Sequence, residues 1–144
     1  MGRMGGEAAD DVDDTPVGKL CELIANGDDD GFRELVASCP SLAFQADKDG
    51  MTPLHWAADR GDEGIIALLL GMLGEGEKAS ARVSARDSSG DTPLHYAVLT
   101  ESREVASLLV ERGADPHVKN NEGETPLALA EGDGWKELLL AKPR

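Results

Sequence analysis

Apolar residues recur at helical spacing in several short segments of the chain. Leu20, Leu23 and Ile24 lie on one face of a predicted helix whose start is marked by Thr15-Pro16, a threonine cap followed by proline. A second short helix is predicted over residues 30–38. Short helices with one apolar face bury that face only against neighbours, so the pattern favours an all-α fold.

The motif Thr-Pro-Leu-His follows this helix pair and then returns. It stands at residues 52–55 and 92–95, and a weaker form, Thr-Pro-Leu-Ala, stands at 125–128. The copies begin 40 and 33 residues apart, so the first interval carries seven extra residues. Self-similarity at such a period predicts a repeat protein, in which stacked units bury a thin continuous core.

Around each copy the sequence predicts a turn and two helices. Gly50 suits the positive φ of a tight turn, Thr52 caps the first helix and Pro53 occupies its first position. Gly61 is expected to end that helix in the left-handed conformation, and residues 62–73 are expected to form the second helix.

Two places depart from the regular pattern. Glu101 stands where the preceding unit has Gly61, and because a left-handed L-residue costs about 1 kcal/mol, we expect that turn to close differently. Residues 74–86 hold the extra length, either as an exposed excursion or as an extended second helix followed by a loop. The cations of this segment are interpreted as solvated charge, with contact to a partner or a phosphate as the alternative; they are Lys78, Arg82 and Arg86.

The ends of the repeat array are atypical. The first unit lacks the motif, as expected of a terminal unit whose outer face meets water. In the last unit Ala128 replaces the histidine, and Leu138, Leu139 and Leu140 cannot all face inward, so this end is an imperfect cap or the cut edge of a longer protein. The expected division is a disordered acidic tail at 1–14, followed by units at 15–46, 47–86, 87–119 and 120–144.

The combined pattern resembles the ankyrin repeat. It contains Asp-x-x-Gly-x-Thr-Pro-Leu-His-x-Ala, a glycine-terminated first helix, a Leu-Leu pair and Gly-Ala-Asp. The resemblance covers residues 17–144 and is most specific over 47–130. It implies an all-α ankyrin-repeat solenoid of about four units, two of them atypical caps, with each unit a β-turn followed by two antiparallel helices.

The resemblance also implies where a partner binds. Ankyrin repeats contact their partners through the turn tips and the far end of each first helix, on a concave face. The matching positions in this chain are Lys48, Asp49, Met51, Asp59, Arg60, Ser88, Ser89, Asp91, Leu99, Thr100, Asn121, Glu122, Glu124 and Asp133.

A narrower similarity is to the ankyrin half of acyl-CoA-binding proteins. It rests on Leu54-His55-Trp56-Ala57, Leu94-His95-Tyr96-Ala97 and Gly113-Ala114-Asp115-Pro116. Those proteins carry a helical acyl-CoA-binding bundle upstream, and the 46 residues before the repeats are filled here by cap helices. The similarity therefore implies a partner-binding half without the lipid-binding half.

Charge narrows the class of partner. The chain has 14 Lys and Arg against 28 Asp and Glu, for a formal net charge of -14. This disfavours nucleic acids and anionic membranes and favours a protein with a basic patch. No apolar run approaches the roughly 20 residues of a membrane span, and residues 1–14 lack the apolar core of a signal peptide. We expect a monomer in the cytoplasm, with the nucleus as an alternative.

Few side chains suggest chemistry of their own. His55 and His95 recur inside the motif, which indicates structural hydrogen bonds in the turns, and no nucleophile accompanies them. Trp56 and Tyr96 occupy equivalent positions and are expected to pack between units, with ligand stacking as the alternative.

Two further features receive structural interpretations. Residues 26–31 resemble the first half of an EF-hand loop, but Ala37 stands where the bidentate glutamate is required, so we expect an acidic helix start instead. Cys21 and Cys39 are expected to be buried, reduced thiols. The sequence thus predicts a non-catalytic protein–protein interaction module without metal or cofactor; the alternative is a regulatory module of an acyl-CoA-binding protein, without its own acyl-CoA site.

Overall fold

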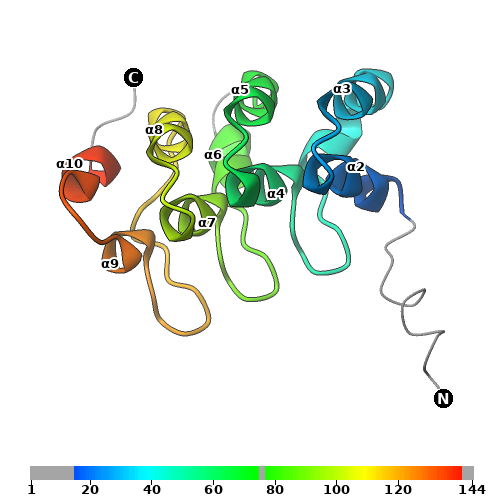
Figure 1. Ribbon diagram of the computed structural model, residues 1–144. Coiled ribbons are helices and arrows are strands. Elements are labelled where there is room, and N and C mark those ends of the chain that lie inside the picture. The colour runs from blue at the N-terminus through cyan, green and yellow to red at the C-terminus, as the bar shows by residue number, and fades with distance from the viewer. Residues whose placement is uncertain (1–14, 75–76, 141–144) are drawn as a thin grey trace, which may run out of the picture.

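The structure is a computed structural model that describes residues 15–74 and 77–140 (Figure 1). The tail predicted at 1–14 lies outside these ranges. Within them every regular element is a helix, which confirms the predicted all-α class. The elements are α2 (Pro16–Ala25), α3 (Asp29–Ser38), η1 (Pro40–Phe44), α4 (Pro53–Arg60), α5 (Glu63–Gly71), α6 (Glu77–Val83), α7 (Pro93–Leu99), α8 (Arg103–Glu111), α9 (Pro126–Leu129) and α10 (Trp135–Leu139).

The helices stack in two rows, as a repeat solenoid requires (Figure 1). The first helices of the pairs, α2, α4, α7 and α9, form one row, and α3, α5, α8 and α10 form the other. The loops that precede α4, α7 and α9 all project to the same side, away from the second row. The turn tips of successive units therefore lie along one edge of the stack.

The core lies between the two rows and continues from unit to unit. Leu54, Leu94 and Leu109 have no exposed surface, and neither do Ala57 and Ala97. Alanine at these helix positions leaves room for the neighbouring helices to approach closely, because its side chain ends at Cβ. These alanines therefore permit tight stacking of the helices.

The turn at Glu101 closes in the same way as the turn at Gly61, so the prediction of a different closure is wrong. Gly61 has φ 70° and Glu101 has φ 58°, both left-handed. The next amide donates back to the first helix in each unit, from Asp62 to Ala57 O at 3.0 Å and from Ser102 to Ala97 O at 2.9 Å. Packing of α8 in the same register as α5 outweighs the local strain of a left-handed glutamate.

Both alternatives predicted for residues 74–86 are wrong. Helix α5 ends at Gly71, and the extra length forms a separate helix, α6. Val83 is fully buried and Ala79 packs against the core, so i, i+4 spacing gives this helix an apolar side. The Arg82 guanidinium donates to Leu73 O at 2.9 Å and lies 4.6 Å from the centre of the Phe44 ring.

The prediction for the two cysteines is only partly confirmed, whereas the prediction for the three consecutive leucines is confirmed. Cys21 is buried as expected, but Cys39 is exposed, because it follows the last turn of α3 at the surface. At the other end, Leu139 is buried and Leu140 is 46% exposed, which confirms that the three consecutive leucines do not all face inward.

Candidate functional site

Each turn tip is held by one side chain at its base. Asp47 Oδ1 accepts hydrogen bonds from the amides of Asp49 and Met51, at 2.9 and 3.0 Å. Asp87 and Asn120 do the same in the next two turns, where their side-chain oxygens accept the amides two and four residues further on. These bonds lock the backbone of the tips before any partner arrives.

Adjacent tips are also joined directly. The amide of Ser88 donates to Asp49 O at 3.0 Å, and the amide of Asn121 donates to Ser89 O at 3.0 Å. Gly50 makes the first contact possible, since a Cβ there would lie 2.9 Å from the Ser88 nitrogen and φ is +77°. The three tips therefore form one connected edge.

The two motif histidines connect each first helix to the following unit. The Thr52 amide donates to His55 Nδ1 at 3.0 Å, so Nε2 carries the ring proton and donates to Asp91 O at 2.8 Å. His95 repeats the arrangement and donates to Glu124 O at 3.0 Å. Both rings are fully buried, and burial lowers the pKa of His55. The structural interpretation of the histidines is confirmed.

Trp56 and Tyr96 also have structural partners. Trp56 Nε1 donates to Asp47 Oδ2 at 3.0 Å, and Tyr96 OH donates to Asp87 Oδ2 at 2.5 Å. Burial, followed by the Asp87 carboxylate, raises the pKa of Tyr96 well above its ordinary value. Each aspartate thus holds its turn with one oxygen and the first helix with the other.

Thirteen of the fourteen candidate contact residues lie on the tips and the first-helix ends, and most are open to solvent. Asp133 was predicted at the end of a first helix, but α9 already ends at Leu129, so Asp133 lies in the segment between α9 and α10. Three are half-buried: Met51, Asp91 and Glu124. Eleven are exposed: Lys48, Asp49, Asp59, Arg60, Ser88, Ser89, Leu99, Thr100, Asn121, Glu122 and Asp133.

Some of these candidates also hold the fold together. The Asp91 carboxylate accepts a hydrogen bond from the side-chain nitrogen of Asn120, and the side-chain nitrogen of Asn121 donates to the Ser88 carbonyl oxygen. The Arg60 guanidinium donates to Ala25 O at 3.2 Å. These residues are poor choices for testing partner binding, because their substitution also disturbs contacts between units.

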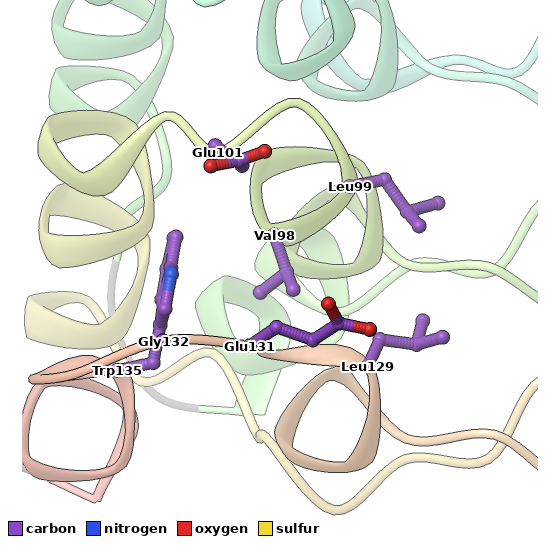
Figure 2. A pocket seen from close by; sticks show the side chains of 7 residues that line it. All are labelled: Val98, Leu99, Glu101, Leu129, Glu131, Gly132 and Trp135. Atoms are coloured by element: carbon purple, nitrogen blue, oxygen red, sulfur yellow. The ribbon is translucent and has the colours of Figure 1, made fainter.

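Two hollows border the candidate residues. A tip hollow of about 310 Å³ is lined by Ser88, Ser89, Asp91, Asn120, Asn121 and Glu122. A C-terminal hollow of about 490 Å³ is shown in Figure 2; it is lined by Val98, Leu99, Glu101, Leu129, Glu131, Gly132 and Trp135.

Of the residues that line the C-terminal hollow, only Leu99 is among the candidates predicted from the sequence. In the sequence, Glu101 stands out only as a residue at the glycine position of a turn, and Glu131 belongs to no motif. The signal that was available is the pairing of a carboxylate at a glycine position with an exposed leucine two residues earlier. Leu99 is 56% exposed and lines the same hollow as Val98 and Leu129.

The charges on the face are mostly negative. Among the fourteen candidates six are carboxylates and two are cations, Lys48 and Arg60. Arg86 adds one more cation near the tips, where its guanidinium donates to the carbonyls of Gly90 and Lys119. Carboxylates therefore outnumber cations among the candidate residues.

The described residues include no set of three or more His, Cys, Asp or Glu side chains placed to hold a metal ion. In the EF-hand-like stretch, Asp28 Oδ1 accepts the Gly31 amide at 2.9 Å, so it caps α3. Burial and the neighbouring Asp62 raise the pKa of Asp29. Across the described part of the chain, the helices are too short or too polar to cross a membrane.

Comparison with known families decides the nature of the scaffold. The family model for ankyrin repeats, in three copies, matches residues 20–120. The chain belongs to the ankyrin-repeat family. This ankyrin-repeat chain carries the family motif in α4 and α7, where its histidines make the contacts between units described above.

Two curated relatives illustrate the range of proteins that contain such repeats. The chain is 36% identical over 108 residues to the probable 26S proteasome regulatory subunit p28 of Saccharomyces cerevisiae, covering 74% of this chain and 46% of that protein. It is 32% identical over 111 residues to NF-kappa-B inhibitor alpha of Gallus gallus, covering 69% and 35%. The chain therefore spans less than half the length of either relative.

A solved structure shares the architecture over most of its length. The crystal structure of the yeast ribosomal protein Rps3 in complex with its chaperone Yar1 contains a chain that superposes with a TM-score of 0.75 and 26% sequence identity. The match covers 85% of this chain and 87% of that one. The likeness confirms the helical repeat solenoid.

Proposed function

We propose that this ankyrin-repeat chain is a non-catalytic module that binds a basic segment of another protein along its turn tips and first-helix ends. The observation that carries the proposal is the alignment of three hydrogen-bonded tips along one edge (Figure 1), with carboxylates outnumbering cations six to two among the fourteen candidate contact residues. Similarity to a proteasome regulatory subunit, an NF-kappa-B inhibitor and a chain from a chaperone complex supports a protein as the partner.

Such a face binds its partner without a change in its own backbone conformation. The bonds from Asp47, Asp87 and Asn120 fix the tips in the free protein, so little backbone entropy is lost on association. Side chains at the tips then select the partner. The formal charge of -14 gives such encounters an electrostatic component and opposes binding to nucleic acids and anionic membranes.

The remaining parts of the proposal rest on the sequence. We propose that the chain acts as a monomer without metal or cofactor, in the cytoplasm or the nucleus. Neither Cys21 nor Cys39 forms a disulfide within the described residues, which suits a reducing compartment.

An acyl-CoA-binding context is the second possibility that the sequence raises, on the motifs around His55 and His95. No contact in the described residues favours it over a general protein-binding role. We therefore keep the protein-binding role as the proposed function.

The test neutralises carboxylates of the tips and of the α4 end whose side chains make no hydrogen bond within the described residues. The tip variant is Asp49→Asn/Asp59→Asn/Glu122→Gln, in which Asp49 and Asp59 belong to the second unit and Glu122 to the fourth. The matched control, Glu34→Gln/Glu111→Gln/Glu137→Gln, removes the same charge from exposed positions of the second row. Quantitative affinity capture from the source cell should recover a partner with the wild type and the control, and much less of it with the tip variant. Equal recovery by all three proteins contradicts the proposed face.

A further inference from the structure

The C-terminal hollow combines an apolar wall with two carboxylates. In Figure 2, Val98 points from α7 into the space between Glu101 and Glu131, which approach it from opposite sides. Leu99 and Leu129 lie at one end of the space, and Trp135 lies at the opposite end. The hollow is therefore bounded by α7, the turn after it, and the segment that runs from the last residue of α9 to the first residue of α10.

The two carboxylates are not used by the fold. Within the described residues, neither the Glu101 nor the Glu131 side chain makes a hydrogen bond or ion pair, and both residues are exposed. The nearby guanidinium of Arg103 lies 4.7 Å from the centre of the Trp135 ring, and within the described residues it makes no hydrogen bond or ion pair with either glutamate. Glu101 and Glu131 thus remain available to a cation from outside.

Glu101 also has an unusual backbone conformation. It is the one described residue other than glycine with positive φ, at 58°, and the preceding unit meets the same requirement with Gly61. The turn itself makes no use of the glutamate side chain. The carboxylate is consequently presented at the rim of the hollow by a backbone conformation that glycine adopts more easily.

We propose that the C-terminal hollow receives an arginine or lysine side chain from a basic segment of the partner protein. The apolar walls formed by Val98, Leu99 and Leu129 fit the methylene stem of such a side chain, and the two glutamates fit its charged head. A volume of about 490 Å³ leaves room for the side chain and part of its backbone. This inference rests on the proposed function and assigns one contact of the partner to one place on the chain.

The first experiment uses a random dodecapeptide library displayed on phage and selected against the full chain. Peptides enriched by the wild type should contain arginine or lysine, and the strongest synthetic peptide should shift the indole Nε1–H resonance of Trp135 in NMR. Its affinity should fall at least about tenfold in Glu101→Gln/Glu131→Gln and less than about twofold in the control Glu111→Gln/Glu137→Gln. Replacing its basic residue by citrulline or norleucine should produce the same loss.

Several results overturn the inference. Selected peptides without basic residues, or equal losses in the two double variants, show that the hollow has no preference for a cation. A dimer of this chain that dissociates in Glu101→Gln/Glu131→Gln assigns the hollow to a second copy. Binding that appears only in Lys142→Ala/Arg144→Ala assigns it to the chain's own C-terminal residues.

A second experiment separates this inference from the proposed function. The captured partner is titrated into the tip variant and into Glu101→Gln/Glu131→Gln. Loss of binding in both supports the inference. Loss only in the tip variant overturns the inference and leaves the proposed function standing, whereas unchanged binding in both contradicts the two together.

Discussion

The His55 ring donates from Nε2 to the carbonyl oxygen of Asp91 at 2.8 Å, and this bond ties the second unit to the turn of the third. Its Nδ1 atom accepts the Thr52 amide at the start of its own helix. One buried side chain therefore caps a helix and connects two units. The same relationship holds between His95 and Glu124, one unit further on.

Replacing His55 by alanine should destabilise the protein by about 2–4 kcal/mol, because it opens a cavity and leaves the Thr52 amide and the Asp91 carbonyl without partners. Urea unfolding followed by circular dichroism measures this loss. His117→Ala is the control, since His117 is exposed. A loss from His55→Ala no larger than that from the control contradicts the structural role.

Stability should also depend on pH through His55. Burial lowers its pKa below the ordinary value of 6.5, so the unfolded chain binds the proton more readily than the folded chain. The free energy of unfolding therefore falls as the pH drops below 6.5, by up to about 1.4 kcal/mol per pH unit, until the folded pKa is reached. Unfolding titrations of the wild type and His55→Gln at several pH values measure the difference. Parallel pH profiles for the two proteins rule out this contribution.

Glu101→Gly should stabilise the chain by about 0.5–1 kcal/mol, since release of the left-handed strain exceeds the added entropy of the unfolded glycine. Glu101→Gln keeps the strain and should change stability by less than about 0.5 kcal/mol. Thermal and urea unfolding compare the two variants. Destabilisation by Glu101→Gly means that the glutamate side chain supports the fold.

Tyr96→Phe should destabilise the protein by about 1.5–3 kcal/mol, the range for a hydrogen bond to a charged group. The substitution removes the donor to Asp87 Oδ2 but keeps the ring, which meets His55 edge to face at 5.7 Å between centroids. A double-mutant cycle with Asp87→Asn isolates the bond. A coupling energy near zero in that cycle indicates that the bond contributes nothing.

The repeated motif was enough to predict the scaffold, because each of its residues has a local physical role. Thr52 and Pro53 start a helix, Gly61 ends it, and His55 recurs with them, so one sequence pattern implies both a unit and its stacking. Exposed positions on the tips followed from the same register.

Features that depend on tertiary contacts were not predicted correctly. The closure at Glu101 is set by the packing of α8, which the local cost of left-handed backbone does not reveal. Helix α6 is stabilised by burial of Val83 and by the contacts of Arg82 with Leu73 and Phe44, all made across the chain. The C-terminal hollow likewise brings Glu101 together with Glu131, which are separated in sequence and share no motif.

The central claim is that the acidic face of the turn tips binds a basic segment of another protein. Isothermal titration calorimetry of the purified partner against the wild type, the tip variant and the second-row control tests it most directly. We predict at least about tenfold weaker binding to Asp49→Asn/Asp59→Asn/Glu122→Gln, a change below about twofold for Glu34→Gln/Glu111→Gln/Glu137→Gln, and weaker wild-type binding as salt is raised. Equal affinities for all three proteins, independent of salt, contradict it.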